Sequence, residues 1–319
     1  MASFLDLLKE KVIVFDGAMG SNLQALNLTI DDWGGPEFEN CSENLLYTRP
    51  DAIEMVHKGF LDVGCDVIET NSFGGSEVVL AEFGIAEKTY DVNKKAAQLA
   101  RRLANDYSTP DKPRFVAGSI GPGTKLPTLG HITYKDLKAA YYEQVRGLID
   151  GGSDILIVET CQDLLQTKAA LAAIFDHFAA NKMKLPVIAQ VTIETFGTML
   201  NGTEIGAALT ALEPFPIDVI GMNCGTGPKQ MADSFKFLSD YSPIPISVLP
   251  NAGLPEVKDG KQHYDETPES FAAQVEHFAK DLGANIVGGC CGTSPEHIKL
   301  LVDRIGGITP KQRDAKLAP

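Results

Sequence analysis

Short, almost continuously apolar runs recur along the whole chain, and longer segments with mixed polar and apolar positions separate them. The runs at 155–158 and 187–191, for example, consist mainly of Ile, Leu and Val. Parallel strands that are buried on both faces have this pattern. We therefore predict eight strands, at residues 12–15, 66–69, 115–118, 155–158, 187–191, 219–222, 246–249 and 286–288.

Amphipathic helices are predicted between these strands. Apolar residues recur at helical spacing over 52–62, 89–105, 134–150 and 163–180. Two more helix starts are indicated near the C-terminus, because a hydroxyl cap, an early proline and a glutamate follow one another there. Their sequences are Thr267-Pro268-Glu269 and Ser294-Pro295-Glu296.

The alternation of strands and helices predicts the fold class. Eight strand–helix units within about 300 residues favour an α/β fold, a single-domain (β/α)8 TIM barrel over residues 1–305. A doubly wound sheet is the alternative, but it would bring the sixth and eighth strands to one site less naturally. Residues 27–49 and 194–202 interrupt the rhythm, and we expect long loops there, at the C-terminal end of the barrel. Residues 306–319 are expected to form a polar linker or tail.

The composition narrows the classes of partner. The chain has 319 residues, 44% of them hydrophobic, and a net charge of −14 without any basic run. Nucleic acid and anionic membranes are therefore poor candidate partners. No apolar stretch reaches membrane-spanning length, and the first 14 residues do not resemble a signal peptide. The six cysteines are then expected to be reduced, as in a cytoplasmic protein.

Three of the cysteines directly follow predicted strands. Cys224 lies in a Gly-Met-Asn-Cys-Gly segment after the sixth strand, and Cys290 and Cys291 lie in Gly-Gly-Cys-Cys-Gly after the eighth. Three thiols at two strand ends predict a soft-metal site, and zinc is the metal we expect. Three ligands leave the fourth zinc position open, as in a catalytic site. A small buried hydrophobe is the other role of a free cysteine, and we expect it for Cys65 and Cys161.

The number of thiolates suggests the reaction. Zinc with three thiolates carries a net charge of about −1, so it polarises water less well than a zinc bound by neutral histidines. It can still hold an incoming thiol as its thiolate, which is the nucleophilic form. The site therefore favours alkyl transfer to a substrate sulfur over hydrolysis. At rest, Asn251 or a water is expected to occupy the fourth position, because Asn251 ends the seventh strand, between the two groups of cysteines.

Acidic residues at other strand ends suit an amino acid substrate. Asp16 and Glu159 follow the first and fourth strands, and an α-ammonium group could lie between them. Backbone amides near Ala18 or Ser119 could meet an α-carboxylate. The alternative is that these acids only bond to the rim of the barrel, and for Glu69 the two roles are evenly balanced. The expected substrate-binding residues are Asp16, Gly17, Ala18, Ser119, Glu159 and Asn251.

Four short motifs carry a family resemblance: DGAMG at 16–20, IVET at 157–160, MNC at 222–224 and GGCCG at 288–292. With them the chain resembles the homocysteine S-methyltransferase family from about residue 12 to residue 305. The resemblance implies that Cys224, Cys290 and Cys291 hold zinc. It also implies that Asp16 and Glu159 help to bind the amino acid group of homocysteine.

Further segments are most similar to the N-terminal homocysteine-binding modules of cobalamin-dependent methionine synthases. They are residues 41–45, 48–51, 69–74, 121–127 and 250–253. The resemblance implies methyl transfer from methylcobalamin to homocysteine, giving methionine. The cobalamin would be held by a corrinoid domain or protein, and a folate-binding domain is a further candidate partner. The chain is expected to be either an excised module or a separate subunit, with residues 27–49 and 124–131 as the docking rim.

Two other functions stay open. The first is a stand-alone homocysteine methyltransferase that takes its methyl group from S-methylmethionine or betaine. A small cationic donor should need an aromatic or acidic cage, and the chain has one Trp. The second is a zinc-binding barrel without catalysis. A donor assay with homocysteine would separate the three functions.

Overall fold

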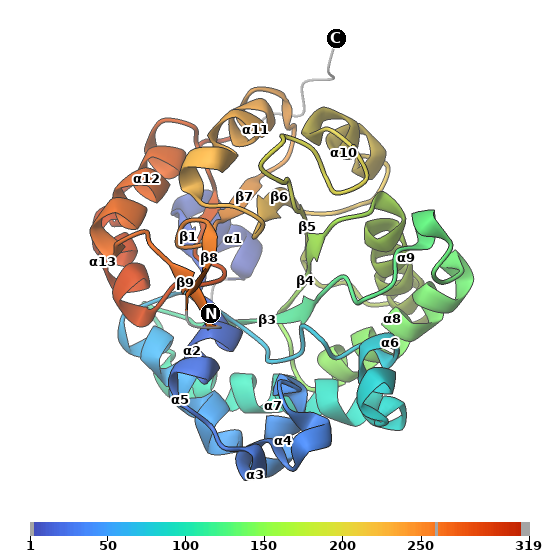
Figure 1. Cartoon of the computed structure of the whole chain (residues 1–319). Helices are drawn as coiled ribbons and strands as arrows, with labels where there is room; N and C mark the ends of the chain where they lie inside the picture. The colour runs from blue at the N-terminus through green and yellow to red at the C-terminus, as the bar shows by residue number, and fades with distance from the viewer. Residues whose placement is uncertain (1–2, 259–260, 314–319) are drawn as a thin grey trace.

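A computed structural model describes residues 3–258 and 261–313, and in this part of the chain eight parallel strands form one barrel (Figure 1). The strands follow the order β1-β10-β7-β6-β5-β4-β3-β2, and a bridge between Phe15 and Val67 brings β1 next to β2. All eight predicted strands are present, with ends shifted by a few residues. They are β1 Ile13–Val14, β2 Val67–Glu69, β3 Phe115–Ile120, β4 Ile155–Cys161, β5 Val187–Val191, β6 Val219–Asn223, β7 Ile246–Leu249 and β10 Ile286–Val287.

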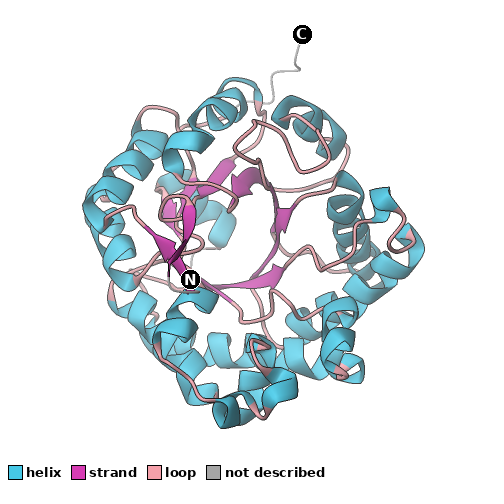
Figure 2. Ribbon diagram, in the orientation of Figure 1, coloured by secondary structure: helices cyan, strands magenta, loops and turns pink. Residues whose placement is uncertain are grey.

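Helices surround the barrel, as Figure 2 shows. The predicted starts of the last two are confirmed: Thr267 accepts a hydrogen bond from the Ser270 amide, and Ser294 forms a capping box with His297. No described helix combines the length and the apolar character needed to cross a membrane. The helices are α1 Phe4–Glu10, α2 Met19–Ala25, α3 Ile30–Trp33, α4 Leu45–Thr48, α5 Pro50–Asp62, α6 Glu77–Leu80, α7 Thr89–Tyr107, α8 Tyr134–Asp150, α9 Leu164–Asn181, α10 Ile205–Leu212, α11 Pro228–Tyr241, α12 Pro268–Lys280 and α13 Pro295–Ile305.

Two apolar cores hold the barrel together. One lies between the strands and the helices, and the other fills the barrel interior with side chains such as Phe15 and Ile157. Helix α1, which the sequence analysis did not predict, adds Phe4 and Leu8 to the interior core, and the Phe4 ring meets the Phe115 ring at 5.7 Å. Because Phe115 begins β3, α1 covers the N-terminal end of the barrel. The opposite end is left for the functional side chains.

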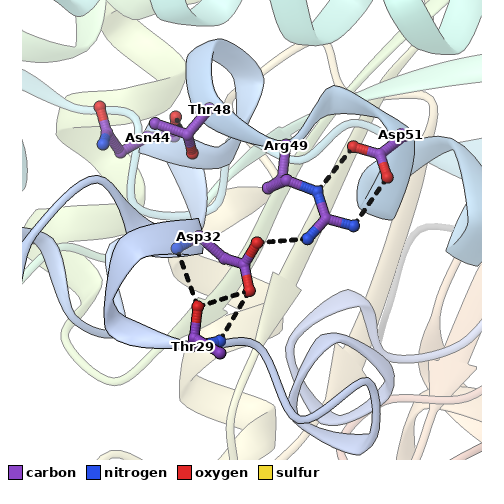
Figure 3. Close-up of polar contacts among 6 residues, drawn as sticks. All are labelled: Thr29, Asp32, Asn44, Thr48, Arg49 and Asp51. Carbon is purple, nitrogen blue, oxygen red and sulfur yellow. Dashed lines mark hydrogen bonds and ion pairs between the residues drawn. The ribbon is translucent and has the colours of Figure 1, made fainter.

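The segment 27–49 is not the loop that we expected. It contains α3 and α4 with two short 3₁₀ turns, and Trp33 of α3 is buried. Thr29 and Asp32 form a capping box, and Arg49 makes ion pairs with both Asp32 and Asp51 (Figure 3). Helices of four residues are too short to show a hydrophobic period, which is why the pattern missed them.

A β-hairpin follows β7 and was also not predicted. Its strands are β8 Pro255–Lys258 and β9 Lys261–Tyr264, which pair antiparallel. The hairpin reaches the end of β10, because a Cβ built on Gly292 would lie 2.3 Å from the Tyr264 ring. Gly292 has a φ of +80°, so both its conformation and its contact require glycine.

Part of the predicted tail lies against the barrel. The Asn285 side chain donates to the Lys311 carbonyl at 3.0 Å, and Arg313 donates to the carbonyls of Ser239 and Gly283. Asn285 directly precedes β10, so residues 306–313 lie at the N-terminal end of the barrel.

Candidate functional site

The three cysteines that follow β6 and β10 come together at the C-terminal end of the barrel. The sulfurs of Cys224, Cys290 and Cys291 lie within 4.8 Å of one another, and those of Cys224 and Cys291 are 3.8 Å apart. Two backbone hydrogen bonds join Cys290 and Cys291 to the segment that follows β7. The Cys290 amide donates to the Pro250 carbonyl, and the Ala252 amide donates to the Cys291 carbonyl. We call these three residues the cysteine cluster. Strand ends far apart in sequence therefore supply one set of sulfurs.

The cysteine cluster fits a zinc ion. Tetrahedral zinc with bonds of about 2.3 Å to sulfur places its sulfurs about 3.8 Å apart, and the Cys224–Cys291 separation has this value. Among the described residues, these three sulfurs are close enough together to hold one metal ion. Asn251 is buried, and its side-chain oxygen has no hydrogen-bond partner among the described residues. The backbone links this segment to both cysteine segments, since the Asn251 amide donates to the Thr226 carbonyl and the Ala252 amide to the Cys291 carbonyl. A buried oxygen without a partner is available as a fourth ligand.

Without a cation, the three thiols share their protons. The pKa of Cys291 is lowered to about 3, because Cys224, Cys290 and the Tyr264 hydroxyl donate hydrogen bonds to its sulfur. Hydrogen bonds with Cys224 and Cys291, together with burial, raise the pKa of Cys290 well above its usual value. The three thiols therefore titrate as one group, with the negative charge favoured on Cys291. A bound metal would displace these protons.

A cavity of about 210 Å³ extends from the cysteine cluster into the barrel mouth. Its wall includes three acidic residues at the ends of strands or just beyond them: Asp16, Glu69 and Glu159. Burial raises the pKa of Asp16 and of Glu69 well above the usual values, and the negative charges nearby raise them further. Burial also raises the pKa of Glu159, to about 7. Two buried acids, Asp16 and Glu159, and the half-buried Glu69 therefore face one cavity and repel one another when ionised.

Two oxygens of these acids lack partners. Asp16 Oδ2 accepts the Glu69 amide at 3.1 Å, and Glu159 accepts the Ser119 hydroxyl at 2.5 Å and the Asn223 side-chain amide at 3.2 Å. Asp16 Oδ1 and Glu69 Oε1 are buried without a hydrogen-bond partner in the described part of the chain. A cationic ligand in the cavity would satisfy them and would remove the repulsion.

The amides expected to meet a carboxylate are engaged within the protein. The Ser119 amide donates to the Thr70 hydroxyl at 3.0 Å, and the Ala18 amide donates to the Thr293 hydroxyl at 3.3 Å. Helix α2 begins at the next residue, Met19, without a side-chain cap. Its first turn, residues 19–21, lines the cavity. The amides of this turn are better placed for an anion than those of Ala18 and Ser119.

The other expected residues lie in the same region. Gly17 lines the cavity, and a Cβ there would come within 2.5 Å of the Thr293 hydroxyl, so the backbone approach requires glycine. Asn251 is buried beside the cysteine segments rather than in the cavity wall. The sequence analysis gave no role to Asn223, although it lies in the MNC motif, or to Tyr264; these residues bond to Glu159 and Cys291 respectively. Asn223 could have been noticed, since it directly precedes Cys224 at a strand end. Nothing in the sequence marked Tyr264.

A comparison with protein families matches residues 13–305 to the homocysteine S-methyltransferase model. The chain belongs to this family. It is 45% identical over 315 residues to a methionine synthase of Mycobacterium tuberculosis, and 46% identical over 295 residues to one of Mycobacterium leprae. These matches cover 99% and 92% of this chain, but 26% and 24% of the relatives. The chain thus spans about a quarter of the length of these two homologues.

The fold of this family member is also found in a solved structure. The homocysteine methyltransferase MmuM from Escherichia coli, in its metallated form, superimposes with a TM-score of 0.76. The alignment covers 93% of this chain and 98% of that one at 23% identity. At this identity the likeness establishes the shared barrel.

Proposed function

We propose that the chain binds homocysteine and zinc and receives a methyl group on the homocysteine sulfur, giving methionine. One observation carries this function: a single cavity is lined both by the cysteine cluster and by three acids, Asp16, Glu69 and Glu159. A small molecule with a thiol at one end and an ammonium at the other fits that arrangement. Family membership and the methionine synthase homologues support the same substrate.

The amino end of the substrate would lie against the acids. Asp16 and Glu69 each have a buried oxygen without a partner among the described residues, and an ammonium group can donate up to three hydrogen bonds. Glu159 is oriented by Ser119 and Asn223, so it can receive the same group. We assign the substrate carboxylate to the first turn of α2, whose free amides point along the helix axis.

The sulfur end would lie at the cysteine cluster, with Asn251 as the resting fourth ligand. Zinc bound there would hold the substrate sulfur as a reactive thiolate at neutral pH. The residues of the chain would position the substrate. The backbone bonds from Cys290 and Ala252 hold the cysteine cluster in place, and the acids would hold the amino end of the substrate. The sulfur is thereby aimed at the barrel mouth.

For the methyl donor we propose methylcobalamin carried by a separate domain or protein. A barrel filled with side chains cannot admit a corrinoid, so the donor would approach over the strand ends. The small cationic donors S-methylmethionine and betaine are the alternative. They call for an aromatic or acidic cage. Phe73 is the one aromatic residue in the described cavity wall, and the three acids of that wall are assigned here to the ammonium group of homocysteine. The lining therefore favours the corrinoid donor.

A donor assay tests this function. The zinc-loaded chain is mixed with homocysteine and, separately, with methylcobalamin, S-methylmethionine or betaine, and methionine is measured by mass spectrometry. We expect methionine from methylcobalamin and none from the other donors. Transfer from a small cationic donor alone would identify a stand-alone methyltransferase. Zinc binding without transfer from any donor would leave a zinc-binding barrel without catalysis. The metal-free chain is the control, and it should be inactive with every donor.

A further inference from the structure

One buried side chain lies between the cysteine cluster and the acids. Asn223 is the last residue of β6 and is fully buried. Its Nδ2 atom lies 3.2 Å from Glu159 Oε2, 2.8 Å from Thr160 Oγ1 and 3.9 Å from Cys290 Sγ. Two N–H groups thus face three acceptors, one of them an acid and another a sulfur of the cluster. Glu159 and the cysteine cluster, which both line the cavity, are thus joined through one amide.

The backbone around this amide is strained. Thr160 and Cys224 have φ values of +56° and +57°, in the left-handed region that residues with a Cβ seldom adopt. Asn223 is joined to both: its Oδ1 accepts the Thr160 amide at 2.7 Å, and Cys224 is its neighbour in sequence. Strained conformations persist when surrounding contacts hold them, and they gather at functional sites. Here the two strained residues, Thr160 and Cys224, flank the Asn223 side chain.

We propose that Asn223 is a positioning residue that sets the spacing between the cysteine cluster and Glu159, and so selects thiol amino acids by chain length. The inference rests on the proposed function. Homocysteine has one methylene more than cysteine between its sulfur and its α-carbon, and a pocket with two fixed ends rejects the shorter molecule. If the amide is lost, Glu159 and Cys290 lose their common partner. Binding of the molecule of the correct length then weakens most.

The experiment measures binding of homocysteine and of cysteine to the zinc-loaded chain by calorimetry. Asn223→Ala is expected to weaken homocysteine binding by roughly 10-fold, the size of one buried hydrogen bond to a charged group, and cysteine binding by less than about 3-fold. The ratio of the two affinities should therefore fall. Asn223→Asp is the second variant. It keeps the oxygen that accepts the Thr160 amide and removes the N–H groups that face Glu159 and Cys290. The ratio of homocysteine to cysteine affinity should therefore be below the wild-type ratio in this variant as well.

Asn285→Ala is the matched control. Asn285 is also a buried asparagine at a strand end, where its side chain accepts the Ile246 amide and donates to the Lys311 carbonyl, both at 3.0 Å, but it lies at the opposite end of the barrel. Its loss should lower the melting temperature and leave the affinity ratio unchanged. An unchanged ratio in both Asn223 variants would overturn the positioning role. Failure of the wild-type chain to bind homocysteine would overturn the proposed function as well.

Discussion

The two ends of the barrel treat equally buried acids in opposite ways. Asp66, just before β2, and Asp16, just after β1, are each 3% exposed. Asp66 forms an ion pair with Lys11 at 2.6 Å, accepts the Val14 amide at 3.0 Å, and lies 3.9 Å from Arg114. Asp16 has no cationic partner in the described chain, and one of its oxygens is unpartnered. At one end the buried charge is paired within the chain, and at the other it is left without a partner among the described residues.

This difference follows from what each end has to do. Charges at the N-terminal end of the barrel are matched within the chain, because nothing else will neutralise them. At the C-terminal end, Asp16, Glu69 and Glu159 face the same cavity, so ionising all three is costly until a cation arrives. Stability is given up there in the ligand-free protein, and binding would restore it. Four substitutions test this contrast.

The largest effect is expected at the cysteine cluster. Cys290→Ala should remove zinc and lower methyl transfer by at least about 1,000-fold, because the metal contributes several kcal/mol to the reaction. The fold should survive, since the residue lies at the barrel rim. Zinc is measured by atomic emission and the fold by circular dichroism. Cys65→Ala, in a buried cysteine outside the cluster, is the control and should keep its zinc. Full zinc content in Cys290→Ala would remove the basis of the metal site.

The next effect is expected at the opposite end, on stability. Asp66→Ala should lower the free energy of unfolding by about 3 kcal/mol, because it leaves Arg114 buried without its acid and the Val14 amide without its acceptor. Urea unfolding of the metal-free chain measures the change. Methyl transfer per folded molecule should stay at the wild-type level. If Asp66→Ala left stability unchanged and impaired methyl transfer, Asp66 would act in the reaction and not in stabilising the barrel, which would contradict this contrast.

A third test concerns Glu159, one of the acids at the C-terminal end of the barrel without a cationic partner among the described residues, and measures how stability depends on pH. Burial raises the pKa of Glu159 from 4.5 to about 7, so between these pH values the folded state holds more protons than the unfolded state. The contribution of Glu159 to the free energy of unfolding must then fall as the pH rises from about 4.5 to about 7, by roughly 3 kcal/mol. Glu159→Gln should remove this fall in the metal-free chain.

The comparison with wild type removes the contributions of groups that do not interact with Glu159. Burial lowers the pKa of His57 to about 4, which makes stability rise with pH up to about 6.5. That contribution is common to both chains and cancels in their difference. Urea unfolding at several pH values should therefore show Glu159→Gln gaining on wild type up to about pH 7 and levelling off above it. A constant difference across this window would show that Glu159 is not held at a raised pKa.

The smallest effect is expected from the hairpin. Tyr264→Phe removes the hydroxyl that donates to Cys291 and keeps the ring that packs on Gly292. A hydrogen bond to a charged sulfur is worth about 1.5 kcal/mol, so zinc should bind about 10-fold more weakly. Competition with a chromophoric chelator measures this. Phe271→Leu, a change in a buried ring of α12 outside the cavity wall, is the control and should not alter zinc affinity.

Most of the site could be found from the sequence, because its residues follow strands. Cys224, Cys290 and Cys291 stand directly after apolar runs, and parallel strands in a barrel deliver their ends to one face. The same logic placed Asp16 and Glu159. It did not place the hairpin, since 255–264 is a polar stretch without the apolar run that marks the other strands. Nor did it show that the amides of Ala18 and Ser119 are taken by neighbouring hydroxyls.

The sequence by itself determined the eight strands, the barrel and the residues at the strand ends, because local hydrophobicity and short motifs encode them. Tertiary structure alone decided which of these residues are partners. Asn223 meets Glu159, and Tyr264 meets Cys291, only after the chain has closed into a barrel. The unmatched charge of the three acids has the same origin. A carboxylate's energy depends on which charges surround it in space, and distance along the chain does not reveal them.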